Sequence, residues 1–477
     1  MRHLPLSDED ADRFLLYAFF AWCVSCVVPV LGLLIQIPAI IYLAIKCDMK
    51  SLPALLVLMF GRNNFALMGS EGQMAIRMGV TLTPTSCLTI TAFFFTLSNL
   101  LKNRYDQGSM AFGYFWLLSS IPAFVISFKA KIYAVAGFWS GPIFDFFVPA
   151  LYYWGMTMGR TYESGKIYLI KRIWIVLAFV VVTSLPRWFY CFTYYPGTLL
   201  LCITYFVLFD QRYKWRHLKM VLIAVSFIAI IQMLFGRRLA LEAAVAEQQT
   251  GEVAEADKTG GTFTAMGIVL CALPFAWTFS KGILRNLYPL FPVLMVMVNV
   301  VLVSYVITTQ SGNHAKEVSH AYETFIERFQ WKLFGDRGAV WTQGWEDVKR
   351  PPVVFKDLRI YWAYKPDGSL GMRVLPHNQY LKLLSRDGLW LGGVLSIFII
   401  WVWVRAFRVL AKDPRDRIIS VVFMPTGAAL FFIDGITGQS TCGADLWANA
   451  LVAIVMPGIV YGQWRYKLKM RRMGCLV

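Results

Sequence analysis

The chain has 477 residues, of which 57% are hydrophobic and only 16% are charged. Soluble domains carry about 25% charged residues, so this composition excludes an ordinary soluble domain and favours a protein embedded in lipid. The net charge of +18 does not indicate a nucleic-acid partner, because most Lys and Arg residues lie in short loops between apolar runs, where the positive-inside rule places them.

The N-terminal segment does not have the pattern of a removable leader. Polar residues at 1–13 precede an apolar run that continues to Ile45 without a small-residue cleavage site, so we expect the first helices to be retained. The 9 cysteines follow no metal-ligand spacing, and most lie inside apolar runs, where a thiol behaves as a small hydrophobic group. We therefore expect no metal site and no cofactor.

Apolar runs recur along the chain and predict an all-α polytopic membrane protein with about 12–14 transmembrane helices. Between Leu15 and Ile45 the pattern fits either two short helices or one long bent helix, and the run at 52–66 is short for a span. The predicted spans lie near residues 14–29, 30–46, 52–66, 80–101, 111–127, 141–157, 168–185, 195–209, 218–236, 264–281, 287–309, 391–411, 418–434 and 444–463.

Charge alternates between the predicted loops. If the N-terminus is cytoplasmic, every second loop is basic and the chain ends on the same side, so we predict a multi-pass membrane protein with both termini cytoplasmic. The basic loops contain Lys46 and Lys50, then Lys102 and Arg104, then Arg160 to Arg172, Arg212 to Lys219, Lys281 and Arg285, Arg405 to Arg417, and the tail from Arg465 to Arg472.

These features divide the chain into four parts. We predict an N-terminal transmembrane bundle at 1–236, a polar outer excursion with two transmembrane helices at 237–309, a large periplasmic loop at 310–390, and C-terminal transmembrane helices with a basic cytoplasmic tail at 391–477. The excursion includes the acidic, polar segment 242–262. The large loop includes 315–331, which predicts an amphipathic helix lying along the membrane surface.

Residues suited to phosphate chemistry gather on the outer side of this topology. His377 precedes the helix predicted at 391–411, Arg337 lies in the same large loop, and Arg237 and Arg238 end the run at 218–236. The planar fork of Arg binds diphosphate oxygens bidentately and stays charged, whereas His changes protonation near neutral pH. We expect one His and two or three Arg residues around an outward-facing site.

In this order and placement the chain resembles the O-antigen ligase and O-antigen polymerase superfamily of bacterial membrane glycosyltransferases. The resemblance covers roughly residues 225–410. At the first position Phe-Gly-Arg-Arg replaces the frequent Ser-Arg-Gly, which leaves the choice between Arg237 and Arg238 open. The matching residues are Arg237 or Arg238, Arg337 with Trp341, and His377, Asn378 and Leu381 with Gly388.

The resemblance implies a location in the bacterial inner membrane and a fold like that of the C-type glycosyltransferases. It also implies transfer of a glycan from undecaprenyl diphosphate to an acceptor sugar at the periplasmic face. It implies that Arg337 and one of Arg237 or Arg238 bind the diphosphate, and that His377 is the general base or positions the reacting groups. The expected partners are an undecaprenyl-diphosphate-linked oligosaccharide, a glycan or lipid A core acceptor, membrane lipids and a chain-length regulator.

Within the family, a polymerase extends a chain, a ligase attaches it to lipid A core, and a third branch glycosylates proteins. The moderate outer loop favours a polymerase, in lipopolysaccharide or exopolysaccharide biosynthesis. From another class, a polysaccharide-lipid flippase or secondary transporter would place polar residues along a central cavity and show two related halves. A structural or assembly protein of the membrane is a third reading.

Each candidate residue also has a purely structural reading. His377 could cap the next helix, and Arg237 and Arg238 could anchor the chain at the lipid interface. Trp341 could belong to an aromatic belt. Asp434, near the outer end of a predicted span, could orient an Arg or His, or could be a carboxylate at a helix end.

Overall fold

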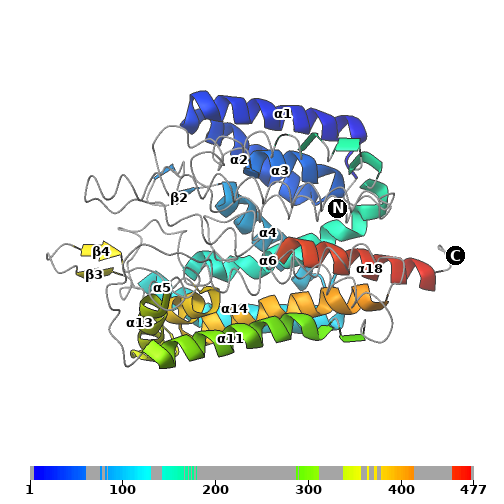
Figure 1. Ribbon diagram of the computed structural model, residues 1–477. Helices are drawn as coiled ribbons and strands as arrows, with labels where there is room; N and C mark the ends of the chain where they lie inside the picture. Colours follow the sequence, from blue (N-terminus) through cyan, green and yellow to red (C-terminus); the bar gives the residue numbers. More distant parts are fainter. Residues whose placement is uncertain are drawn as a thin grey trace, which may run out of the picture.

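The computed structural model describes residues 5–60, 76–77, 81–82, 84–129, 142–165, 286–310 except 288, 337–355, 362–364, 370–372, 378–412 and 454–473, with short stretches between 167 and 179. These residues are mostly helical, and most of the helices lie side by side in one bundle (Figure 1). The helical character predicted from hydropathy is thus confirmed for this part of the chain.

The first apolar run forms two helices rather than one. Helix α1 (Asp8–Val27) begins at Ser7, whose hydroxyl accepts a hydrogen bond from the Asp10 backbone N–H at 3.0 Å. Helix α2 (Pro29–Lys46) follows after Val28, with a proline at its first position. A 3-10 turn, η1 (Met49–Ser51), then leads into α3 (Leu52–Phe60), so the predicted span at 52–66 begins at the expected residue.

The remaining described helices are α4 (Pro84–Leu101), α5 (Gln107–Lys129), α6 (Pro142–Met158) with the 3-10 turn η3 (Gly159–Thr161), α11 (Phe291–Gln310), α13 (Arg337–Lys349), α14 (Gln379–Lys412) and α18 (Met456–Arg472). Of these, α4, α5, α6 and α11 follow predicted spans closely, α14 and α18 overlap theirs, and α13 lies in the predicted large loop. Helix α18 extends through residues predicted as a tail, because Lys and Arg are good helix formers and are stabilised at a helix C-terminus.

Two short antiparallel ribbons modify the all-α expectation. Strand β1 (Ile76–Arg77) pairs with β2 (Thr81–Leu82), and β3 (Trp362–Tyr364) pairs with β4 (Leu370–Met372). Aromatic residues favour strands, and the sequence Pro366-Asp367-Gly368 between β3 and β4 is a turn signal that the helical interpretation overlooked. The predicted outer loop therefore carries a small hairpin as well as a helix.

Helices α6 and α18 pack closely through paired glycines. A Cβ atom at Gly155 would lie 2.5 Å from the carbonyl oxygen of Val455, and a Cβ at Gly159, Gly458 or Gly462 would overlap the backbone of the opposite segment. Each side of the contact thus has two glycines separated by three residues. This spacing lets helix backbones approach closely and is common between membrane helices.

The surface of the bundle is unusually apolar. On α11, Leu294, Met297, Val301 and Tyr305 are exposed, although large exposed apolar patches on soluble monomers are rare. Among the described residues, α11 and α14 contain the two stretches, Pro292–Thr309 and Asp387–Lys412, whose length and composition suffice to cross a membrane. Several polar side chains are buried instead, including Gln36, Thr96, Asn99, Ser120 and Asn299.

Candidate functional site

Helices α11, α13 and α14 meet in a small buried cluster at the start of α14. Its buried members are Val306 of α11, Trp341 and Val348 of α13, and Leu381 of α14. The Trp341 side chain is fully buried, with 0% exposure. It therefore packs the helices together and does not lie in an exposed aromatic belt. Trp341 follows Arg337 by about one helical turn, and Leu381 follows His377 by a similar interval in sequence.

Asn378 fixes the first turn of α14. Its Oδ1 accepts a hydrogen bond from the Leu381 backbone N–H at 2.8 Å, which caps the helix. Its Nδ2 donates to Oδ1 of Asn299 on α11 at 3.0 Å. Both halves of the Asn378 amide are therefore used, and only 2% of the residue is exposed. The predicted supporting residue Asn378 is a helix cap that also ties α14 to α11.

Asn299 is a site residue that the sequence interpretation missed. It lies within the apolar stretch of α11, is 1% exposed, and has no hydrogen-bond acceptor for its Nδ2 among the described residues. A polar side chain inside an apolar helix is costly unless it is paired. The isolated Asn between Val298 and Val300 was the signal that could have identified it.

Helix α14 has a sharp break at Gly388, near the end of the predicted outer loop. Gly388 has φ 81°, a left-handed conformation that favours glycine, and it divides the helix into two segments. The backbone N–H groups of Leu389 and Trp390 donate to the carbonyls of Val353 and Val354 at 3.0 and 3.1 Å. These bonds satisfy two donors that a new helix start leaves without an intrahelical acceptor.

The predicted site residues fall into two groups. The structure places Trp341 and Asn378 where α11, α13 and the start of α14 meet, and we call this region the Asn378 junction. Arg337 is the first residue of α13, which packs on α14. His377, Arg237, Arg238, Asp434 and the Arg337 side chain lie outside the described residues, as do the segments 242–262 and 315–331. Helix α14 begins within the segment predicted as outer loop, and its break at Gly388 precedes the predicted span.

A second polar cluster lies at the opposite end of α14. Arg405 Nη1 donates to Ser109 Oγ at 2.9 Å, and Nη2 lies 3.2 Å from Asp106 Oδ2. The guanidinium also lies over the rings of Trp401 and Tyr461, with its carbon 4.4 and 3.8 Å from their centroids. From Gly388 to Arg405 the helix rises about 25 Å, so this cluster is remote from the Asn378 junction.

The Asp106 carboxylate is stabilised by its surroundings. It precedes α5 and accepts hydrogen bonds from the backbone N–H and the hydroxyl of Ser109 at 3.3 and 2.8 Å. Burial raises the pKa of this carboxyl, but the Ser109 hydrogen bonds and the charge of Arg405 outweigh it, so the pKa lies below its ordinary value. Asp106 is therefore ionised at neutral pH and forms an ion pair with Arg405.

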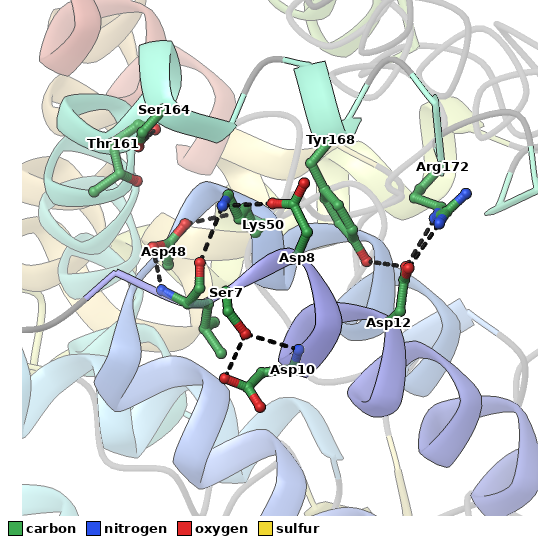
Figure 2. Close-up of polar contacts among 11 residues, drawn as sticks. Ser7, Asp8, Asp10, Asp12, Asp48, Lys50, Thr161, Ser164, Tyr168 and Arg172 are labelled. Atoms are coloured by element: carbon green, nitrogen blue, oxygen red, sulfur yellow. Dashed lines mark hydrogen bonds and ion pairs between the residues drawn. The ribbon is translucent and has the colours of Figure 1, made fainter.

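A third cluster ties the start of α1 to segments distant in the sequence (Figure 2). Arg172 donates to both carboxylate oxygens of Asp12 at 2.7 and 2.6 Å, and the Tyr168 hydroxyl donates to Oδ1 at 3.0 Å. The hydrogen bond from Arg172 is the main cause of the lowered pKa of Asp12. Figure 2 also shows Lys50 directed toward Asp8, and the two charged atoms lie 2.6 Å apart.

Contacts place several of the predicted basic loops at one end of the bundle. Arg160 donates to the Arg104 carbonyl at 2.9 Å, and Lys467 lies 3.6 Å from Glu163. With the pairs Lys50–Asp8, Arg172–Asp12 and Arg405–Asp106, these contacts join loops that the alternation of charge assigned to the same side. We call this the basic end of the bundle.

Within the described part of the chain, no group of three or more His, Cys, Asp and Glu residues could hold a metal ion. Comparison with known protein families, with curated proteins and with solved structures finds no match to this chain.

Proposed function

We propose that this chain is a multi-pass glycosyltransferase of the bacterial inner membrane that transfers an undecaprenyl-diphosphate-linked glycan to an acceptor sugar at the periplasmic face, as a polysaccharide or O-antigen polymerase. One observation carries the proposal. The helix that begins with Arg337 and the helix that follows His377 pack against each other around Trp341 and Leu381. This packing brings together two segments that the sequence pattern assigns to one reaction site.

The membrane placement rests on physical grounds. Exposed apolar side chains on α11 suit a lipid environment better than water, and the paired glycines of α6 and α18 suit close packing of membrane helices. The basic end fits the cytoplasmic side by the positive-inside rule. The Asn378 junction, at the other end of α14, then faces the periplasm.

The reaction needs little from the protein beyond orientation and charge stabilisation. The acceptor hydroxyl oxygen forms a bond to the anomeric carbon of the donor glycan, and the bond from that carbon to the diphosphate oxygen breaks. The electron pair leaves with undecaprenyl diphosphate, and the hydroxyl proton passes to His377. Arg337 and Arg237 or Arg238 stabilise the departing diphosphate.

The position of Arg337 as the first residue of α13 favours the same role. The first backbone N–H groups of a helix have no intrahelical acceptor and carry a partial positive charge. An anion near this helix start gains from those groups and from the Arg337 guanidinium together. A 13-residue helix is long enough for this arrangement.

Complementation tests the proposal in cells. In a strain that lacks the protein, we expect His377→Ala and Arg337→Ala to insert normally but to stop glycan extension, while the undecaprenyl-linked precursor accumulates. One of Arg237→Ala and Arg238→Ala should behave in the same way. Matched controls are His320→Ala in the same outer loop and Arg350→Ala beyond the far end of α13, and both should retain extension.

The banding of the residual product separates the two family reactions. A polymerase defect leaves single repeats attached to the acceptor, whereas a ligase defect leaves full-length chains on the lipid carrier. Wild-type extension by all four site variants would reject the glycosyltransferase proposal.

The buried Arg405–Asp106 pair favours one rival function, a secondary transporter or lipid flippase. Ionisable residues within membrane helices often mark transport pathways, and a pair at one end could close such a pathway. The rival predicts that Asp106→Asn alters movement of the lipid-linked glycan across the membrane. The glycosyltransferase proposal predicts that Asp106→Asn lowers the stability of the protein but does not change movement of the lipid-linked glycan.

A further inference from the structure

The hydrogen-bond chemistry of Asn378 determines the orientation of its partner Asn299. The Leu381 backbone N–H is a donor, so the Asn378 atom that faces it must be the amide oxygen. The Asn378 nitrogen therefore faces Asn299, and Asn299 must present its oxygen in return. The pair has one arrangement that uses both Asn378 groups, and this arrangement is the one observed.

The position of Asn299 along α11 shows where this hydrogen bond holds Asn378. From Asn299 to the last residue, Gln310, the helix extends about 16 Å, so Asn378 is held well inside the apolar stretch. Only 1% of Asn299 and 2% of Asn378 are exposed, so both residues are almost fully buried. In such an environment hydrogen bonds are stronger than in water, so the pair resists displacement.

The neighbouring helix packing reinforces the same point of attachment. Leu381 and Leu384 pack against Val306 and other residues of α11, whereas Gly392, beyond the break, lies against the carbonyl of Leu383. The short segment from Gln379 to the break is thus held on both sides. Its N-terminal end is held by the Asn299–Asn378 bond, and His377 directly precedes Asn378 in the chain.

We propose that Asn299 is a positioning residue, which anchors the exit of the outer loop through Asn378, the residue that directly follows His377 in the sequence. The inference rests on the proposed function, since it assigns His377 the role of base. In this role Asn299 acts through neighbouring residues and not on the substrate itself. Its effect passes through the amide of Asn378 and the first turn of α14.

Substitutions can separate the anchor from the helix cap. Asn378→Ser keeps a hydroxyl oxygen for the Leu381 N–H, but its side chain is too short to reach Asn299. Asn299→Leu removes the acceptor and keeps a side chain of the same branching, and Asn299→Asp keeps an acceptor for Asn378. The control is Ser304→Ala, an exposed position on the same helix. His377→Ala is measured in parallel.

The measurements use the full-length protein in proteoliposomes with an undecaprenyl-diphosphate-linked oligosaccharide. A misplaced catalytic group lowers kcat by roughly 10- to 100-fold, so we expect that loss in Asn299→Leu and Asn378→Ser, with KM for the lipid-linked donor changed less than about threefold. Amide hydrogens at 379–384 should exchange faster in both variants. The double variant should lose little more than either single variant, and Asn299→Asp should recover part of kcat.

Different results would overturn different claims. If His377→Ala is inactive but Asn299→Leu keeps wild-type kcat, or if exchange at 379–384 is unchanged, Asn299 is not a positioning residue. If Asn299→Leu gives less folded protein but wild-type kcat per folded molecule, Asn299 has a packing role only. If wild type transfers no glycan, the proposed function fails, and the exchange rates alone then show whether Asn299 anchors the loop exit. If His377→Ala transfers glycan as well as wild type, glycosyl transfer stands but His377 is not the base, and the positioning role of Asn299 falls with it.

Discussion

The guanidinium carbon of Arg405 lies 3.8 Å from the ring centroid of Tyr461, which joins α14 to α18 at the basic end of the bundle. Because the same guanidinium pairs with Asp106 and stacks on Trp401, one side chain connects α14 and α18 to the start of α5. Only 12% of the Arg405 side chain and 14% of the Asp106 side chain are exposed. Removing one partner would leave the other charge buried and unpaired.

Arg405→Ala should therefore destabilise the protein strongly. Breaking a buried ion pair from one side costs about 3–5 kcal/mol, so we expect a large fall in melting temperature in detergent, measured by loss of the folded peak on size-exclusion chromatography after heating. The exposed pair Lys349–Glu346 is the matched control, and Lys349→Ala should change stability by less than about 1 kcal/mol. Equal effects of the two variants would contradict the assignment of Arg405 as a buried connector.

The same ion pair predicts a pH dependence. The pKa of Asp106 in the folded protein lies below its ordinary value of 3.8, so its contribution to stability is present above that value and is lost as the pH falls through the lower folded pKa. The difference in melting temperature between wild type and Asp106→Asn should be constant from about pH 7 to about pH 5 and should shrink toward about pH 3. A difference that grows on acidification would show that Asp106 is protonated in the folded state.

Adjacent glycines in α14 give a matched test of the fold at the loop exit. A Cβ at Gly392 would lie 2.5 Å from the backbone oxygen of Leu383, whereas a Cβ at Gly393 would have no atom within 4 Å. Gly392→Ala should cost about 1–3 kcal/mol in the free energy of unfolding through overpacking, and Gly393→Ala should be neutral or stabilising. Equal thermal stability of the two variants would contradict the close approach of the two segments of α14.

Gly388→Ala tests the break itself. An L-residue with a side chain in the left-handed region costs about 1–2 kcal/mol, so we expect a lower melting temperature and faster amide exchange at Leu389 and Trp390. A straight helix through residue 388 would instead be stabilised by alanine, so an increase in melting temperature would refute the break.

Local sequence patterns predicted the helices well, because each apolar run determines its own secondary structure. The division at Val28 was left open between two readings, and the structure shows two helices. The hairpin β3–β4 was missed because the chain was interpreted as all-α, although the aromatic residues of this segment favour strands.

Contacts between distant segments could not be predicted in this way. Arg405 was counted only as a loop charge, since its partner Asp106 lies 299 residues earlier in the chain. Trp341 gave no sequence signal that would distinguish a buried contact with α11 from a membrane-facing position. The partnership of Asn299 with Asn378 likewise depends on how α11 and α14 pack, although the isolated Asn in an apolar run was a recognisable sign.

Glycosyl transfer by the purified protein tests the central claim most directly. The full chain in proteoliposomes is given an undecaprenyl-diphosphate-linked oligosaccharide, and mass spectrometry follows the released undecaprenyl diphosphate and the extended glycan. We predict that wild type and His320→Ala form both products in equal amounts, while His377→Ala and Arg337→Ala form neither. Absence of both products with wild type, or undiminished release by His377→Ala, would contradict the account.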